Sequence, residues 1–160
     1  APKALDIELF LSLPRPKNLP RILQTITTIG VKKIHLFHSY RVEKSFWQSE
    51  YLSQPVIDEA LWLGLEQARD TVLPEVQFHR YFKPFVEDEV PLLVKSRKGY
   101  LAHPVGSSER AIEKPATLVI GPEGGLIEYE VEKFREQGFE LLSLGERILK
   151  VETALVAALT

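Results

Sequence analysis

Apolar runs of strand length alternate with helical patterns from the beginning of the chain. The run from Ala4 to Leu11 is followed by a segment, Leu19 to Ile29, in which isoleucines recur at helical spacing, and then by a second apolar run from Lys33 to His38. Asn18 is a suitable N-cap for this helix, and Gly30 is a suitable end. A strand, a helix and a strand in this order predict a βαβ unit and a parallel sheet.

The middle of the chain continues this alternation less regularly. A polar loop, Ser39 to Ser45, precedes a long predicted helix from Glu50 to Arg69, and Val76 to Phe82 predicts the next strand. The acidic segment Pro84 to Glu89 is expected to be exposed. A further short strand is expected at Tyr100 to Ala102.

The last part of the chain contains two apolar runs that each end in a glycine-bearing turn. Thr117 to Ile120 leads into the turn GPEGG (121–125), and Phe139 to Leu144 leads into the turn GER (145–147). An amphipathic helix, Ile127 to Gln137, separates them. Ligands of open α/β sheets lie beyond the carboxyl ends of the strands, so we expect the active site at these two turns.

Composition narrows the class of protein without deciding its function. A length of 160 residues predicts one domain, and 44% hydrophobic with 26% charged residues is ordinary for a soluble globular protein. The net charge of −2 gives no overall sign of a nucleic-acid partner. The absence of cysteine excludes disulfides and thiolate zinc sites, and the four histidines lack metal-ligand spacing, so no metal is expected.

Two features of the sequence concern location and completeness. The apolar runs are too short to span a bilayer and the beginning has no signal-peptide pattern, so a cytoplasmic location is expected. The chain contains no methionine, so we expect it to be a piece of a longer protein.

The two turns are the main candidates for chemistry. GPEGG is neither a Walker loop nor a GxGxxG motif, but its adjacent glycines permit close backbone approach and Glu123 places a carboxylate at the strand end; a glycine-rich turn with a solvated glutamate fits it equally well. Arg147 and Lys150 precede a predicted helix that could hold anionic or carbonyl groups, and a turn with exposed charges fits these residues too. The position of both turns at the ends of consecutive strands favours function.

Other polar and aromatic residues have a structural interpretation beside the functional one. Arg41 and Lys44 supply positive charge that could bind phosphates, although a solvated loop is the commoner interpretation. His103 follows a predicted strand and could lie near the site, but a lone histidine before proline is more often structural. Trp47 and Trp62 are interpreted as packing or interface residues rather than base-stacking platforms.

With the motifs in view, the chain resembles a known family. IGPEGG, a helix with the pattern E-x-x-x-F, and LGERILKVETA are similar to the signature of the ribosomal RNA small-subunit methyltransferase E family, which are uridine-N3 methyltransferases of the SPOUT (α/β-knot) superfamily. The resemblance implies a mostly parallel α/β sheet flanked by helices, with a C-terminal deep trefoil knot at about 117–160. It implies S-adenosylmethionine as cofactor, a homodimer, and a uridine of 16S ribosomal RNA as substrate.

The resemblance also implies roles for individual residues. Glu123 is the candidate base or water-orienting group, and Arg147 is the candidate for charge stabilisation or RNA contact. RNA contacts are expected from Arg41, Lys44, Arg69 and Lys150. The residues expected to line the cofactor are Leu101, His103, Ile120, Gly121, Gly125, Leu144, Gly145, Ile148, Leu149 and Thr153.

The chain departs from the family in several places. We expect this chain not to include the family's N-terminal β-barrel (PUA-like) RNA-binding domain, and Asp70 and Val72 occupy positions where the resemblance implies basic residues. Lys150 replaces an arginine that is commoner in the family, which keeps the charge but loses bidentate geometry. Two alternatives therefore stay open: a knot methyltransferase acting on another RNA, and a non-catalytic module that binds RNA or cofactor.

Overall fold

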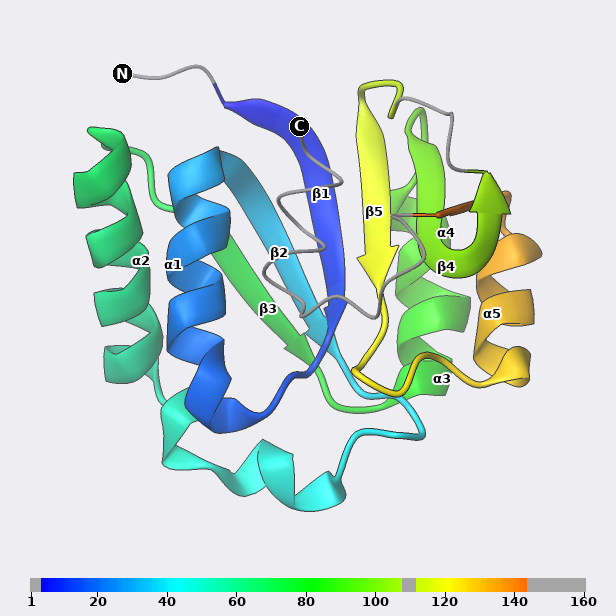
Figure 1. The fold of residues 1–160 in the computed structure, drawn as a ribbon, viewed down its shortest axis with the longest axis horizontal. Coiled ribbons are helices and arrows are strands. Elements are labelled where there is room, and N and C mark those ends of the chain that lie inside the picture. Colours follow the sequence, from blue (N-terminus) through cyan, green and yellow to red (C-terminus); the bar gives the residue numbers. More distant parts are fainter. Residues whose placement is uncertain (1–3, 108–111, 144–160) are drawn as a thin grey trace.

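A parallel β-sheet forms the centre of the molecule (Figure 1). The computed structural model describes residues 4–107 and 112–143. Within them, six strands lie in the order β3-β2-β1-β5-β4-β6, and every neighbouring pair is parallel. The strands are β1 (Leu5–Ser12), β2 (Val31–Phe37), β3 (Glu75–His79), β4 (Lys98–Ser107), β5 (Ala116–Ile120) and β6 (Glu140–Leu142). The α/β class predicted from the alternating pattern is confirmed.

Helices cover both faces of this sheet (Figure 1). The α-helices are α1 (Leu19–Ile29), α2 (Gln54–Ala68), α3 (Phe82–Pro84), α4 (Val90–Leu93) and α5 (Glu128–Arg135). Shorter 3-10 helices are η1 (Pro16–Asn18), η2 (Lys44–Gln48) and η3 (Glu50–Leu52), and a π-helix, η4 (Phe85–Glu89), joins α3 to α4. Helices α1 and α2 pack on one face, while η4, α4 and α5 pack on the other.

The central strand β1 shows how the sequence separates the two cores. Side chains alternate between the two faces of a strand. Leu9 and Leu11 enter the aliphatic core beneath α1 and α2, while Phe10 enters an aromatic core beneath η4 and α5. In that core Phe10 meets Phe85 edge to face, with ring centroids 5.2 Å apart. All four side chains are fully buried.

Several predicted boundaries need correction. The segment Pro84 to Glu89 is not simply exposed, because Phe85 and Val86 are completely buried in the aromatic core. The helix predicted from Glu50 begins at Gln54, after the separate turn η3, because the chain is extended at Ser53. The strand predicted to end at Phe82 ends at His79, since Phe82 already opens α3.

The structure corrects the predicted capping of α1 at its beginning and confirms its predicted end. Asn18 occupies the N-cap position of α1, but its side chain makes no capping hydrogen bond. Gly30 ends the helix as predicted, with a left-handed φ of 107° that favours glycine. Its backbone N–H donates to the carbonyls of Ile26 and Thr27. The chain then enters β2 directly at Val31.

Candidate active site at the carboxyl ends of the strands

The GPEGG turn leaves the carboxyl end of β5, a strand in the middle of the sheet. The N–H of Gly125 donates to the carbonyl of Pro122 at 2.8 Å, and Gly125 has a left-handed φ of 85°. A Cβ added to Gly121 would lie 3.0 Å from Cγ of Leu126, so the turn is closed tightly around this glycine. Glu123 is exposed at the tip of the turn. The predicted position of this turn is confirmed.

Arg41 reaches this turn from the neighbouring crossover. It lies in the loop after β2, and its Nη1 donates to the carbonyl of Gly124 and, at 3.4 Å, to that of Gly125. One strand, β1, thus lies between β2, which precedes Arg41, and β5, which precedes the turn that Arg41 contacts. A guanidinium that binds main-chain carbonyls fixes the loop in position while its other N–H groups stay available.

Glu130 connects the same two segments from inside the protein. This carboxylate is only 3% exposed. Its Oε1 accepts a hydrogen bond from the N–H of Ile127 at 3.0 Å, and its Oε2 accepts one from the N–H of Tyr40 at 2.9 Å. A carboxylate in the first turn of α5 is favoured by the helix dipole and by the unpaired N–H groups there.

Sequence reasoning missed this role of Glu130. Glu130 lies three residues after Ile127, the residue that precedes α5. A glutamate at this spacing is a helix-capping signal that can be recognised in the sequence. The contact with Tyr40 has no such signal, because 90 residues separate the two in the chain. Glu130 therefore belongs to the framework of the candidate site, together with Arg41.

The loop after β2 is itself held closely against the sheet. The hydroxyls of Ser12 and Ser39 are hydrogen-bonded at 2.7 Å and fully buried, which joins the end of β1 to the end of β2. The N–H of Val42 donates to the carbonyl of Ser39 and closes a turn there. These contacts aim Arg41 at the end of β5.

The part of the predicted cofactor site that lies in described residues comes together. Leu101 in β4 pairs with Val119 in β5, so the strand positions that lead to His103 and to Gly121 lie side by side. Leu101 and Ile120 are buried, and His103 is partly exposed. The strand β6 ends beside β4, where Leu142 pairs with Ala102. The other predicted residues, Leu144, Gly145, Arg147, Ile148, Leu149, Lys150 and Thr153, lie outside the described residues.

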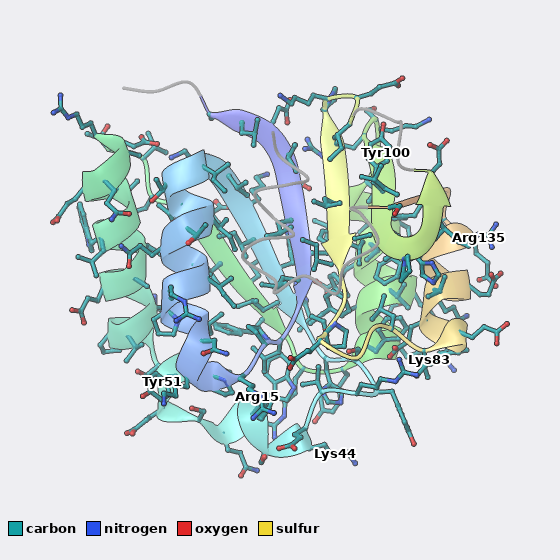
Figure 2. All side chains as sticks on the ribbon, viewed as in Figure 1. Arg15, Lys44, Tyr51, Lys83, Tyr100 and Arg135 are labelled. Carbon is teal, nitrogen blue, oxygen red and sulfur yellow. The ribbon has the colours of Figure 1, made fainter. Side chains whose placement is uncertain are left out.

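The predicted RNA contacts do not all lie on one edge. Lys44 is exposed at the start of η2 (Figure 2), which follows the loop after β2 that carries Arg41. Arg69 is exposed at the C-terminal end of α2, at the opposite edge of the sheet. The neighbouring Asp70 there binds Lys32, at the beginning of β2. The structure therefore does not bring Arg69 to Arg41 and Lys44, and Lys150 lies outside the described residues.

Asp70 has a structural explanation. Its carboxylate lies 2.5 Å from Nζ of Lys32 and accepts hydrogen bonds from the N–H groups of Thr71 and Val72. The Lys32 ammonium, followed by these N–H groups, holds the pKa of Asp70 below its usual range. Asp70 thus fixes the turn between α2 and β3, where the resemblance had suggested a basic residue.

Positive charge gathers at the carboxyl edge around His38. Burial lowers the pKa of His38 below its usual value, and the nearby charges of Lys44 and Arg80 lower it further. The indole N–H of Trp47 donates to Nδ1 of His38 at 2.9 Å, which requires that this nitrogen carry no proton. Trp47 packs against the aliphatic core, as interpreted from the sequence, whereas Trp62 is 53% exposed on α2.

Residues 4–107 and 112–143 provide neither a metal-binding cluster nor a membrane-spanning helix. They contain no cluster of three or more His, Cys, Asp or Glu side chains placed to hold a metal ion. None of their helices is long and apolar enough to cross a membrane.

The fold and site together define a class of protein. A parallel sheet with a glycine turn at the carboxyl end of a central strand is the arrangement in which α/β proteins bind ligands. The chain belongs to the RNA methyltransferase domain family, which matches residues 1–160.

Relatives place the chain more closely within this class. It is 29% identical over 158 residues to the ribosomal RNA small subunit methyltransferase E of Treponema pallidum, covering 95% of this chain and 59% of the relative. The chain therefore spans about three-fifths of the length of this relative.

Solved structures show the same fold. The ribosomal RNA small subunit methyltransferase E of Neisseria gonorrhoeae, bound to S-adenosyl methionine, matches with a TM-score of 0.77 at 24% identity, over 97% of this chain and 64% of that one. The SpoU methyltransferase AviRb of Streptomyces viridochromogenes, in complex with AdoMet, matches with a TM-score of 0.60 at 17% identity, over 98% of this chain and 58% of that one. The fold is thus that of the SpoU/SPOUT methyltransferases.

Proposed function

We propose that this chain methylates N3 of a uridine in small-subunit (16S) ribosomal RNA, with S-adenosylmethionine as methyl donor. The observation that carries the proposal is the GPEGG turn at the end of β5, whose carbonyls bind Arg41, while Glu130 links the beginning of α5 after the turn to Tyr40. Family membership and the named relatives support the reaction class. A homodimer, a knot at about 117–160 and a cytoplasmic location belong to the same proposal.

The residues at this edge suit a cofactor with an adenosine part. Gly121 and Gly125 carry no side chain, which favours close approach of a ligand to the main chain, and the buried Leu101 and Ile120 form the apolar ends of the neighbouring strands. Bound there, the cofactor supplies an electrophilic methyl group on a sulfonium. The predicted residues from Leu144 to Thr153 complete the proposed binding site.

The protein must deal with one proton and one developing charge. N3 of uridine carries a proton at neutral pH, so its loss has to accompany or precede attack on the methyl group. Glu123, exposed at the turn, is proposed to accept this proton directly or through water. Arg147 is proposed to stabilise the negative charge on the uracil oxygens. The remaining acceleration comes from holding N3 in line with the methyl group.

Methyl transfer to defined RNAs tests the proposal. Labelled S-adenosylmethionine would be offered with small ribosomal subunits, naked 16S RNA, and transfer RNA, and the product nucleoside would be identified by mass spectrometry. We expect 3-methyluridine in small-subunit RNA. Methylation of another RNA alone would favour the first alternative, and cofactor binding without transfer to any RNA would favour a non-catalytic module.

Substitutions separate the cofactor site from the proton acceptor. Glu123→Gln should lower kcat by about 10²- to 10⁴-fold with cofactor affinity preserved. Arg41→Ala should weaken cofactor binding, measured by calorimetry, because the turn loses its external support. Arg135→Ala is the matched control, since Arg135 pairs with Glu132 on the exposed face of α5. Undiminished transfer by Glu123→Gln would exclude this residue as the base.

A further inference from the structure

Three exposed tyrosines come from segments that follow β2, β3 and β5, at the edge of the sheet that carries the GPEGG turn. Tyr40 follows β2, Tyr81 immediately precedes α3, and Tyr129 lies in the first turn of α5. Their exposed fractions are 77%, 67% and 49%, although large aromatic side chains usually bury most of their surface. Packing against the described residues therefore leaves about half or more of each tyrosine exposed.

Direct contacts show that the three segments are neighbours. The N–H of Tyr40 donates to Glu130, the residue after Tyr129. The ring of Phe82, the residue after Tyr81, lies 6.3 Å from the ring of Tyr129. Figure 1 shows α3, the beginning of α5 and the loop after β2 at the same end of the molecule. The segments that carry the three exposed tyrosines thus come together at one end of the molecule.

Basic side chains are interleaved with these rings. Nζ of Lys133 lies 5.6 Å from the centroid of the Tyr129 ring, within the range of a cation–π contact. Arg80, which precedes Tyr81, is exposed and makes no ion pair within the described residues. Lys83 is exposed at the same end of the molecule (Figure 2).

Acidic neighbours neutralise this charge only weakly. Lys83 is 3.9 Å from a carboxylate oxygen of Glu87, and Lys133 is 4.0 Å from one of Glu136, both along exposed helical turns. Such pairs are worth a few tenths of a kcal/mol and are screened by salt. Phosphates can therefore compete for both lysines. We call this region, made of Tyr40, Tyr81, Tyr129, Arg80, Lys83 and Lys133, the tyrosine surface.

We propose that the tyrosine surface binds the unpaired nucleotides that flank the target uridine, an inference that rests on the function proposed above. Exposed aromatic rings stack bases, which only a single-stranded or opened RNA can present, and interleaved cations neutralise its phosphates. Tyr40 precedes Arg41, which contacts the GPEGG turn, so a strand on this surface extends toward the proposed methyl donor. The flanking RNA would then be held open beside the site.

Binding of a short RNA tests this inference separately from catalysis. The probe is a fluorescein-labelled single-stranded RNA of mixed sequence containing uridine, followed by anisotropy, with a blunt duplex of the same sequence for comparison. Each of Tyr40→Ala, Tyr81→Ala and Tyr129→Ala should weaken binding of the single strand by about 5- to 100-fold, the range measured for lost base stacking. Tyr→Phe at the same positions should retain the affinity, because the ring is kept.

Charge substitutions and a control complete the design. Arg80→Gln and Lys83→Gln should each reduce the slope of log affinity against log salt by about 0.7, the value for one phosphate of a single strand. Trp62→Ala removes an equally exposed aromatic on α2 and should leave affinity unchanged. The cofactor affinity of every variant is measured by calorimetry and should match that of the native chain.

The outcomes distinguish this inference from the proposed function. Native-like RNA affinity in all three alanine variants would overturn the tyrosine surface, whether or not the protein methylates RNA. A change of oligomeric state in these variants, with RNA affinity retained, would overturn it in favour of a contact between copies of this chain. Loss of RNA affinity with unchanged cofactor binding would support it. Failure of the native protein to bind cofactor would instead contradict the proposed function, and the anisotropy result would stand.

Discussion

At the scale of single residues, Glu130 joins the two segments that frame the candidate site. Its two oxygens accept hydrogen bonds from two N–H groups, one on each of the segments that frame the candidate site. A glutamine can accept only through its single carbonyl oxygen and would turn an N–H donor toward the other donor. Charge and hydrogen-bonding capacity are therefore both needed here.

Glu130→Gln should lower the free energy of unfolding by about 1–3 kcal/mol, the cost of leaving a buried donor unsatisfied. Urea unfolding followed by circular dichroism measures this loss. Glu132→Gln removes the same charge from the exposed face of α5, where it pairs with Arg135, and should change stability by less than about 0.5 kcal/mol. Equal stability of the two variants would show that the Tyr40 and Ile127 contacts contribute nothing.

A second residue-scale feature is a hydrogen-bonded series of two buried histidines, His35 and His79, and the exposed Glu89. Nδ1 of His35 lies 2.8 Å from Nε2 of His79, and Nδ1 of His79 lies 3.1 Å from Oε2 of Glu89. An ionised carboxylate can only accept, so Nδ1 of His79 donates, its Nε2 accepts, and Nδ1 of His35 donates. Phe85 stacks on His79 with ring centroids 4.2 Å apart. Both hydrogen bonds are thus satisfied when the two histidine rings are neutral.

Burial is the main reason that the pKa of His35 is lowered to about 4, and the charges of His79 and Lys33 lower it further. Burial also lowers the pKa of His79, against the opposing effect of Glu89. In the unfolded chain a histidine titrates at about 6.5, so the unfolded state takes up the proton first as pH falls. The stabilising contribution of neutral His35 is complete above about pH 6.5 and is lost between there and about pH 4.

The unfolding free energy of the native protein should therefore fall over this pH window, by on the order of 3 kcal/mol from His35. His35→Gln keeps a donor for His79 but cannot titrate, so its unfolding free energy should depend less steeply on pH between 6.5 and 4. Urea titrations at several pH values measure both slopes, and NMR titration of the His35 ring gives its pKa directly. If the unfolding free energy of the native protein and that of His35→Gln depended equally steeply on pH, His35 would not be the group that titrates.

At the scale of elements, α1 and α2 approach unusually closely at Gly64. A Cβ added there would lie 2.6 Å from Cβ of Thr27 and 2.7 Å from the carbonyl oxygen of Gln24. Both distances are shorter than real Cβ contacts, and one partner is main chain that cannot rotate away. Gly64 therefore serves the packing of two helices despite its poor helix propensity.

Gly64→Ala should destabilise the protein by about 1–2 kcal/mol, because overpacking of α1 against α2 exceeds the gain of about 1 kcal/mol in helix propensity. Leu63→Ala, one residue away and 42% exposed, should change the unfolding free energy by less than about 0.5 kcal/mol. Urea unfolding of the native protein and of both variants measures these changes in the free energy of unfolding. A more stable Gly64→Ala variant would mean that the two helices can separate without cost.

Elements differ in how far the sequence predicts them. The positions of β1, α1, β2 and β5 follow from continuous apolar runs or helical spacing bounded by glycine or proline. The burial of Phe85 and Val86 could not be predicted, because their acidic neighbours suggest exposure and the partners Phe10 and Phe37 are remote in the chain. The later beginning of α2 was predictable in principle, since Pro55 is typical of a first helical turn.

The candidate site also has parts that the sequence predicts and parts that it does not. The GPEGG turn was predictable at the end of its strand because glycines after an apolar run indicate a turn. The support from Arg41 and Glu130 was not, because it depends on strand order, which places β2 and β5 on either side of β1. Arg69 shows the converse: a basic residue that fits the family pattern lies at the other edge of the sheet.

At the scale of the whole molecule, one sheet separates two cores of different composition. The core beneath α1 and α2 is almost entirely aliphatic, and the other contains Phe10, Phe37, Phe85, Phe134 and Phe139. Successive residues of β1 belong to different cores, so neither core can form without fixing the strand that the other requires. We therefore expect the two cores to unfold together in one transition.

Leu9→Val and Phe10→Leu test this cooperativity, because their side chains leave β1 on opposite faces. Each should lower the free energy of unfolding by about 1 kcal/mol through lost packing. Tryptophan fluorescence reports mainly on Trp47 at the aliphatic side, and near-ultraviolet circular dichroism also reports on the phenylalanine cluster. In both variants the two signals should shift together to the same lower urea midpoint with an unchanged slope, since one strand links both cores. A midpoint that moved in only one of the two signals would show that the cores unfold independently, and the loop after β2 and the GPEGG turn would then depend on different halves of the molecule.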